Sequence, residues 1–412
     1  MNALRLYYFF VFAMYAVVIP HYQIFLRATG YTPASVGLMI GFFEIFGVIG
    51  PILLGGLADR TGRFREIKVA TILLGAVTIA FLLADPPFPL ALFLSALTGF
   101  LFKVSVPLTD AVAGSVLADP REQYGQVRVF GSIGFAAAAV AVPAFSLLDD
   151  SDPYSIMIAF LVSMALFAAV VLLIPPPSPL EEGEKPETNR VAATATPNGP
   201  TAPAAPSAGT AETVTAGNGD LPLLFWLVIA AISVGNIAFG AYNSFFSLYL
   251  KEELEVRAVT LFWAIGAVSE IPIIFYSGKL IRRFGIGILL TASAFIMSAR
   301  LLLYGLAPTA ALVVLIQALH AVTFGVMLSA GVAYVNQTAP RRTRGTAMAA
   351  FDALGIGLAV FVGSTVGGYL VEAIGYTGMF SALAIAPAVS GVMLLLLTRR
   401  KESGLGVSKP LR

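Results

Sequence analysis

A group of ionisable side chains lies within long apolar stretches of this sequence. In chain order they are Glu44, Lys103, Asp110, Arg128, Glu270, Arg300, His320 and Asp352. A charge at the centre of a bilayer costs roughly 2.5–3.5 kcal/mol even on a lenient scale, so such residues pair, line a cavity or stay neutral. Buried carboxylates and a histidine can bind and release protons, whereas cations can bind a polar solute. The chemistry open to this group is therefore solute binding and proton transfer.

The composition indicates that these stretches lie in a membrane. Hydrophobic residues make up 58% of the 412 residues, charged residues only 12%, and the mean hydropathy is +0.87. A soluble domain has about 25% charged residues. We therefore predict a lipid bilayer as the chain's surroundings.

The same counts exclude several functions. The net charge of +2 gives no reason to expect nucleic acid as a partner, and without cysteines there is no disulfide or thiolate metal site. No phosphate-binding loop and no Gly-x-Ser-x-Gly pattern is present. We expect no enzyme, no cofactor and no metal, so energy for any transport must come from a gradient.

Apolar segments divide the chain into two similar halves. A helix needs roughly 20 apolar residues to cross a bilayer. The predicted spans of the first half are 5–26, 34–57, 67–84, 90–117, 124–147 and 154–174. Those of the second half are 221–250, 257–281, 287–306, 309–336, 344–370 and 376–398. The expected fold is an all-α membrane protein of twelve helices, six in residues 1–174 and six in residues 221–398.

Two segments lie outside this pattern. Residues 175–220 begin with three prolines and continue rich in Ala, Thr, Pro and Gly, which is typical of a disordered linker. Residues 399–412 form a basic tail. We expect both to be cytoplasmic.

The distribution of basic residues predicts the orientation. With both termini in the cytoplasm, the outer loops hold only Arg27, Lys251 and Arg257. The cytoplasmic segments hold Arg5, Arg60, Arg63, Arg65, Lys68, Arg121, Lys185, Arg190, Lys279, Arg282, Arg283, Arg341, Arg342, Arg344, Arg399, Arg400, Lys401, Lys409 and Arg412. The positive-inside rule then places the chain in the inner (cytoplasmic) membrane as a multi-pass protein.

A short basic turn occurs once in each half. The first copy, Gly55-Gly-Leu-Ala-Asp-Arg-Thr-Gly-Arg63, lies between the second and third spans, and a degenerate copy begins at Gly278. Such a repeat is typical of transporters built from two like halves. We predict a cytoplasmic gate at this turn, formed by Gly55, Asp59, Arg60, Gly62 and Arg63.

With this motif the chain resembles the major facilitator superfamily. The stretch from Tyr124 to Phe135 is similar to the start of the fifth span in the phenylpropionate permease-like and lactose permease-like branch, and Ile316 to Gly325 is similar to its tenth span. The resemblance implies a sugar-binding role for Asp110 and Arg128. It also implies proton coupling at Arg300 and His320, although Thr323 stands where a glutamate is expected.

From the residues and the resemblance together we assign two sets of roles. The substrate-binding set is Lys103, Asp110, Arg128, Arg300, Tyr22 and Tyr242. The proton-coupling set is Glu44, Glu270, His320 and Asp352. Lys103 and Asp110 are seven residues apart, and we expect them on one face of a single helix.

Structural alternatives remain open for several of these residues. Asp110 and Arg128 could form only a clamp between neighbouring spans. Arg300 could be tied to Asp352 or to Glu270, and His320 could be a packing residue.

The expected function is proton-coupled symport of a small organic solute by alternating access, in a monomer. Three cations within the spans favour an organic or aromatic acid, with a sugar or nucleoside as the alternative. Other hypotheses are a drug or metabolite exporter and, from a different class, a non-transporting solute sensor.

Overall fold

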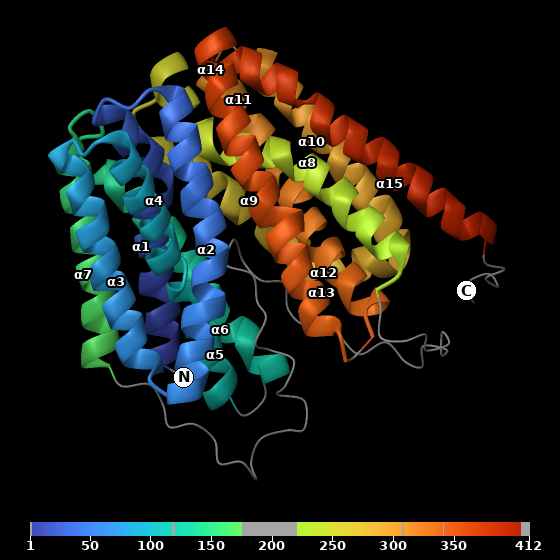
Figure 1. The fold of residues 1–412 in the computed structure, drawn as a ribbon, viewed down its shortest axis with the longest axis horizontal. Helices are drawn as coiled ribbons and strands as arrows, with labels where there is room; N and C mark the ends of the chain where they lie inside the picture. The colour runs from blue at the N-terminus through green and yellow to red at the C-terminus, as the bar shows by residue number, and fades with distance from the viewer. Residues whose placement is uncertain (1, 118–119, 175–220, 307–308, 341, 405–412) are drawn as a thin grey trace.

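The computed structural model describes residues 2–117, 120–174, 221–306, 309–340 and 342–404. These residues contain helices and turns and no strand, so the predicted all-α class is confirmed for this part of the chain. The predicted linker at 175–220 and most of the predicted tail lie outside the described residues. Figure 1 shows two helical bundles side by side, one from each half of the sequence.

The helices of the first bundle follow the predicted spans. They are α1 (Asn2–Ala28), α2 (Pro33–Thr61), α3 (Phe64–Phe81) with the short η1 (Leu82–Ala84), α4 (Phe88–Phe102), α5 (Ser105–Val116), α6 (Pro120–Ala144) and α7 (Pro153–Leu173). The second bundle has more interruptions. It consists of α8 (Leu223–Leu248), η3 (Tyr249–Glu253), α9 (Val259–Phe284), α10 (Ile286–Leu306), α11 (Ala310–Gln317), η4 (Ala321–Val326), α12 (Met327–Thr338), α13 (Arg344–Ala350), η5 (Phe351–Leu358), α14 (Ala359–Leu383) and α15 (Ile385–Gly404).

Ten helical stretches of the described chain are long and apolar enough to cross a membrane, or eleven if a bent pair within α9 is one span. One of the ten, Arg344–Arg399, has 56 residues and contains Gly375, whose φ of +74° interrupts the helix. In Figure 1 the chain turns back at the upper end of α14 and descends through α15. The expected count of twelve spans remains a prediction.

Local signals explain where α2 begins and ends. The side chain of Thr32 accepts a hydrogen bond from the Ser35 amide, and Pro33 occupies the first turn, where its missing N–H is no loss. The helix ends at Gly62, which has a φ of +70° and donates its N–H to the Ala58 carbonyl. Because a left-handed cap favours glycine, Gly62 of the basic turn has a structural reason to be glycine.

The fourth predicted span contains an irregular turn. Lys103 and Val104 separate α4 from α5, but both keep right-handed helical backbone angles, and Phe88–Val116 still forms one stretch long enough to cross a membrane. The expectation that Lys103 and Asp110 share one helical face stays a prediction. Their side chains bind different partners, Glu44 and Tyr8.

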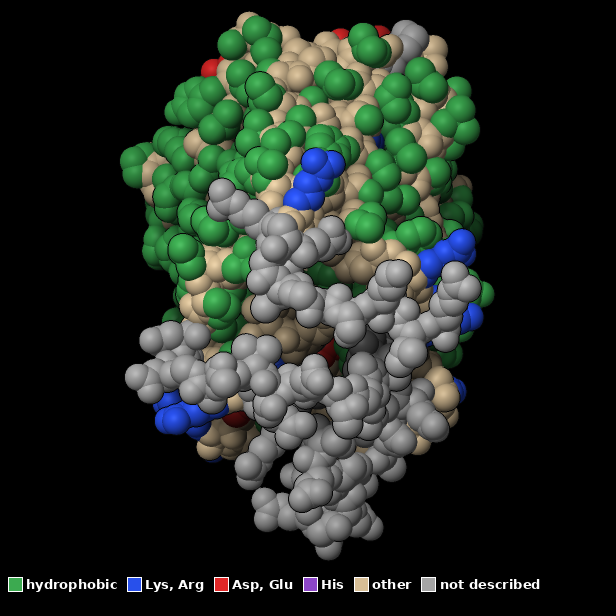
Figure 2. Space-filling view, turned by 90° about the vertical axis from the view of Figure 1, so that its right-hand side faces the viewer, with side chains coloured by type: hydrophobic (Ala, Val, Ile, Leu, Met, Phe, Trp, Pro, Cys, Tyr) green, Lys and Arg blue, Asp and Glu red, His purple; other side chains and the backbone are tan. Residues whose placement is uncertain are grey.

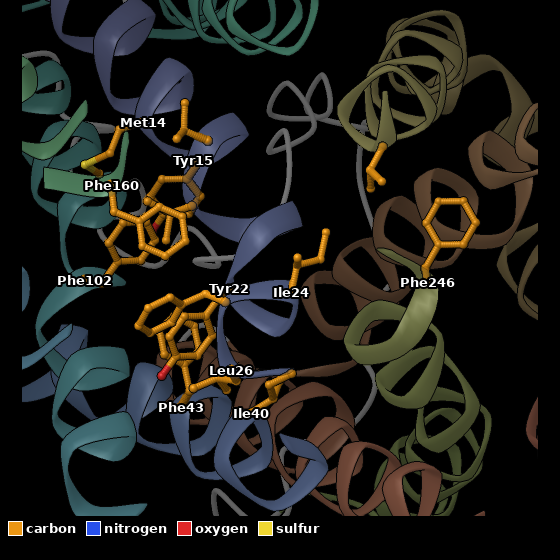
Figure 3. Close-up of a cluster of buried hydrophobic side chains, with 14 of the residues drawn as sticks. Met14, Tyr15, Tyr22, Ile24, Leu26, Ile40, Phe43, Phe102, Phe160 and Phe246 are labelled. Atoms are coloured by element: carbon orange, nitrogen blue, oxygen red, sulfur yellow. The ribbon is translucent and has the colours of Figure 1, made fainter. Parts of the chain in front are cut away.

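Aromatic and aliphatic residues fill the interior of the first bundle. The ring of Tyr15 stacks on Phe102 with centroids 4.6 Å apart, and Tyr22 lies against Phe43 at 4.9 Å. Figure 3 shows these side chains between α1 and its neighbours, with Phe246 of α8 across from them.

The two bundles contact one another through the middle of the spans and through the ends predicted to lie outside. A Cβ on Gly37 of α2 would lie 2.3 Å from the Ser364 carbonyl oxygen of α14, which shows how closely these helices pack. Arg27 Nε lies 3.1 Å from Glu252 Oε1, and Lys251 Nζ lies 3.2 Å from Asp150 Oδ1. Each of these pairs joins the two bundles.

The outer surface is apolar over much of its height. Figure 2 shows hydrophobic side chains across the upper part of one face, with basic side chains both among them and toward the lower part. The extent of this apolar surface suits a protein surrounded by lipid.

Candidate functional site

The ionisable residues of the second bundle meet around Arg300. This α10 residue is fully buried, and its guanidinium NH1 donates to His320 Nδ1 at 3.0 Å and to the Thr323 hydroxyl at 2.9 Å. Its NH2 donates to Gln317 Oε1 at 2.8 Å. The Tyr242 ring of α8 lies 4.4 Å from the guanidinium carbon. The positive charge of Arg300 is therefore stabilised mainly by neutral hydrogen-bond acceptors and by the face of an aromatic ring.

His320 connects Arg300 to Glu270. The second nitrogen of His320, Nε2, lies 2.7 Å from Glu270 Oε1 on α9, and only 4% of the Glu270 side chain is exposed. A guanidinium only donates hydrogen bonds, so His320 Nδ1 must accept. The imidazole is then neutral and carries its proton on Nε2, from which it donates to Glu270.

Two residues of this cluster are missing from the predicted site. Gln317 lies one turn before His320 and contacts Arg300, and Tyr304 receives hydrogen bonds from Arg300 Nε and NH2. Gln317 stands in the Ile316–Gly325 stretch on which the family resemblance rests, so its position could have drawn attention to it. Tyr304 follows Arg300 by one helical turn, the spacing at which side chains on a helix meet.

Asp352 does not join this cluster. It lies on η5, and its Oδ1 is buried with no hydrogen-bond partner among the described residues. The contacts of Arg300 go to residues of α8, α10, α11 and η4 instead. Of the two carboxylates considered for Arg300, the structure therefore brings only Glu270 close, and through His320.

A second polar group surrounds Asp110 in the first bundle. Asp110 Oδ1 accepts from the Tyr8 hydroxyl at 2.5 Å and from the Tyr124 hydroxyl at 2.9 Å. The guanidinium carbon of Arg128 lies 5.4 Å from the centroid of the Tyr8 ring and 4.0 Å from that of Phe12. Tyr8 thus lies against Arg128 with its ring and donates to Asp110 with its hydroxyl.

Glu44 and Lys103 form a separate buried pair. Lys103 Nζ lies 2.8 Å from Oε1 and 2.7 Å from Oε2 of Glu44. A Cβ on Gly47 would lie 2.8 Å from Lys103 Cγ, so glycine leaves the space that the lysine stem occupies. The two residues were assigned to different roles, whereas the structure binds them to each other.

Tyr22 makes no hydrogen bond, among the described residues, to the charged residues that were assigned with it. Its hydroxyl is 2.7 Å from the Ser95 hydroxyl, and its ring packs on Phe43. Tyr242, by contrast, lies in the Arg300 cluster.

Lys68 was counted among the cytoplasmic basic residues, and the structure corrects this. The side chain is 1% exposed inside α3, and its Nζ donates to the Thr109 hydroxyl at 3.0 Å. The Tyr7 ring lies 5.0 Å away. The apolar pattern already placed Lys68 in the predicted span 67–84, and only the count of basic residues assigned it to the cytoplasmic side, because neither registers which helical face the residue occupies.

The predicted gate residues lie at the end of α2 and in the turn that leads to α3. Asp59, Arg60 and Arg63 are exposed, and none makes an ion pair with another residue that the structure describes. Gly55 is half-buried, and Gly62 caps α2. Among the described residues there is also no group of three or more His, Cys, Asp or Glu that could hold a metal ion.

Comparison with known proteins gives the family. The MFS_1 like family matches residues 1–382. Maltose permease of Geobacillus stearothermophilus is 28% identical over 408 residues, which cover 98% of this chain and 96% of the relative. The probable 3-phenylpropionic acid transporter of Escherichia coli (strain K12) is 24% identical over 388 residues, which cover 93% and 94%.

Solved structures show the same fold. The crystal structure of the nucleoside transporter NupG aligns with a TM-score of 0.74 at 17% identity, over 97% of this chain and 98% of that one. The relatives are permeases and transporters, so the prediction that the chain is no enzyme holds. The chain belongs to the MFS_1-like family and is a multi-pass membrane transporter of the major facilitator type.

Proposed function

We propose that this transporter is a proton-coupled symporter of a small organic solute that works by alternating access. The observation that carries the proposal is the continuous hydrogen-bonded series from Arg300 through His320 to Glu270. The series places a permanent cation, a titratable ring and a carboxylate in one buried path. Such groups within a membrane are costly and are kept where a proton moves.

The series can exist in two charge states. With His320 neutral, Nδ1 accepts from Arg300 and Nε2 faces Glu270. A second proton on the ring would occupy Nδ1, so the Arg300 contact would break and the guanidinium would turn to another acceptor. Proton binding at Glu270 and His320 is thereby linked to the position of Arg300, which is the kind of link that coupling requires.

The substrate class that these contacts support best is a neutral solute rich in hydroxyl groups. Three cations in the spans favoured an organic anion, but Glu44 neutralises Lys103 at 2.7 Å. The Asp110 group offers a carboxylate, tyrosine hydroxyls and a stacked arginine, which suit hydroxyl recognition. The maltose-named relative supports a sugar. An aromatic acid is the second candidate because Arg128 lies on the Phe12 face and a relative is named for 3-phenylpropionic acid.

The described contacts between the bundles support a conformation closed on the outer side and open to the cytoplasm. The contacts Arg27–Glu252, Lys251–Asp150 and Gly37–Ser364 lie on one side of the membrane under the predicted orientation. On the other side, the exposed Asp59 and Arg60 make no ion pair with another described residue, as expected for an open gate.

Uptake by the purified protein in proteoliposomes tests the proposal. Radiolabelled maltose, 3-phenylpropionate and uridine are offered with and without an inward proton gradient. We expect one of these solutes, with maltose first, to accumulate only with the gradient, and its addition to make the outer medium more alkaline. Uptake that is equal with and without the gradient, with no proton movement, would contradict symport.

A further inference from the structure

Gln317 is buried at the centre of the Arg300 cluster, where its side-chain amide is fully engaged. Its Oε1 accepts from Arg300 NH2 at 2.8 Å and from the Tyr304 hydroxyl at 2.5 Å. Its Nε2 donates to the Phe262 carbonyl at 3.0 Å and reaches the Tyr242 hydroxyl at 3.1 Å. Because the carbonyl of Phe262 can only accept and Arg300 can only donate, the amide has one orientation that satisfies both.

This orientation determines where the Arg300 guanidinium points. The guanidinium is planar, with its donors in a fixed fork. Tyr304 binds Nε and NH2, and Gln317 binds NH2, so NH1 is left to face His320 Nδ1 and Thr323. The tautomer of His320 depends on that NH1 donor.

We propose that Gln317 is the positioning residue of the proton path: by holding Arg300 NH2, it directs NH1 at His320 Nδ1 and keeps the His320 proton on Nε2, facing Glu270. The significance of this for coupling rests on the proposed function. The hydrogen-bond relation between Gln317 and the His320 tautomer does not, and it can be tested without any solute.

Side chains from three helices surround His320 in the part of the chain that the structure describes. The titratable and charged groups that face it and Gln317 are Tyr242 from α8, Glu270 from α9, and Arg300 and Tyr304 from α10. The α9 backbone fits closely against both residues. A Cβ on Gly266 would lie 3.0 Å from Gln317 Nε2 and 3.2 Å from His320 Cδ2.

The histidine content makes the test direct. The chain has two histidines, so a spectrum of protein labelled with ¹⁵N-histidine has two sets of ring signals. His21 Nδ1 lies 2.8 Å from the Val17 carbonyl oxygen, which can only accept, so His21 carries its proton on Nδ1. The two rings are therefore expected to be opposite tautomers, and a His21→Asn variant assigns the signals.

Two variants change the position of Arg300 in different ways. Gln317→Leu removes the acceptor for Arg300 NH2, and we expect the Nδ1–H tautomer of His320 to appear beside the Nε2–H form. Gly266→Ala pushes on both residues with a methyl group and should produce the mixed tautomers without changing a polar group.

The matched control is Gln23→Leu, the same change at a buried glutamine of the other bundle. It should leave the His320 signals as in the parent protein. Size-exclusion chromatography and helical circular dichroism check that each variant is folded. A single Nε2–H tautomer in the folded Gln317→Leu variant would overturn the proposal.

The experiment separates this inference from the proposed function. If the parent protein couples solute to protons while the Gln317→Leu variant keeps the parent spectrum, the positioning role is wrong and symport stands. If the spectra change as expected while the parent protein moves no protons with any solute, Gln317 positions Arg300 and the symport proposal fails.

Discussion

Lys103 Nζ lies 2.7 Å from Glu44 Oε2, where at most 5% of either side chain is exposed. A buried ion pair is weak evidence for stability, but removal of one partner leaves a charge without compensation. The pair joins α2 to the turn between α4 and α5. It therefore acts as a tie within the first bundle, whereas the sequence assigned Lys103 to solute binding.

The first prediction separates these two roles. Glu44→Leu and Lys103→Met should each lower the free energy of unfolding by about 3–5 kcal/mol, because each leaves one buried charge alone. The double variant should recover most of that loss in a thermal-unfolding measurement. Transport should recover with it, because the account gives Lys103 no direct contact with the solute. A double variant that is stable but inactive would show that the pair also binds the solute.

The second prediction concerns the ion pairs that join the bundles on the outer side. Arg27–Glu252 and Lys251–Asp150 are partly exposed, so each is worth about 0.2–1 kcal/mol and is screened by salt. Arg27→Gln and Lys251→Gln should therefore shift the population toward the outside-open state by up to about fivefold each. The chain has no cysteine, so spin labels at Ser151→Cys and Glu253→Cys can report the distance between the bundles without background.

High salt should widen that distance distribution in the parent protein and have little further effect in the doubly substituted protein. A conservative Arg27→Lys variant serves as the control because it keeps the charge. Distance distributions that respond neither to salt nor to the glutamine substitutions would show that these pairs do not stabilise outer closure.

The third prediction follows from the burial of Lys68. An amine-reactive reagent applied to the folded protein should modify the exposed Lys279 and leave Lys68 and Lys103 unmodified. Peptide mass spectrometry measures the modified fraction at each position. All three lysines should react once the protein is unfolded. Rapid modification of Lys68 in the folded protein would return it to the cytoplasmic side, where the count of basic residues placed it.

The contrast between Lys68 and Arg300 shows what the sequence could predict. The class of fold, the two halves and the positions of most helices follow from apolar length and from breakers such as Gly62 and Pro153, which act locally. The burial of Lys68 depends on the face of α3 that packs against α5 and Tyr7. Neither spacing nor composition reports that face.

The sequence also could not predict which buried acid pairs with which buried base. Glu44, Lys103, Asp110 and Arg128 balance in sign, but sign alone does not decide which acid meets which base. Lys103 donates to Glu44, while Asp110 accepts from two tyrosines. In the second bundle, Glu270 and Asp352 were equal candidates for Arg300, and the tertiary fold brings only Glu270 to the His320 end of the series.

The fourth prediction tests the Asp110 group as the solute site. Tyr8→Phe and Tyr124→Phe each remove one hydroxyl donor to Asp110 while keeping the ring. A hydrogen bond to a charged group contributes about 1.5–3 kcal/mol, so each variant should lose about that much free energy of unfolding. We expect the KM for the transported solute to rise as well, because Asp110 is then held by one tyrosine only. Arg128→Gln should abolish accumulation in a protein that remains folded. Unchanged uptake by Arg128→Gln would remove this group from the solute site.

The most direct measurement for the account as a whole is solute-driven proton movement in a Glu270→Gln variant reconstituted in proteoliposomes. Glutamine keeps the shape of Glu270 and can accept from His320 Nε2, but it cannot take up a proton at this position. If Glu270 carries the coupled proton, we expect this variant to exchange solute across the membrane but to accumulate none in response to a proton gradient. Addition of solute should cause no pH change. Gradient-driven accumulation accompanied by proton uptake in this variant would contradict the central claim that Glu270, next to His320, carries the coupled proton.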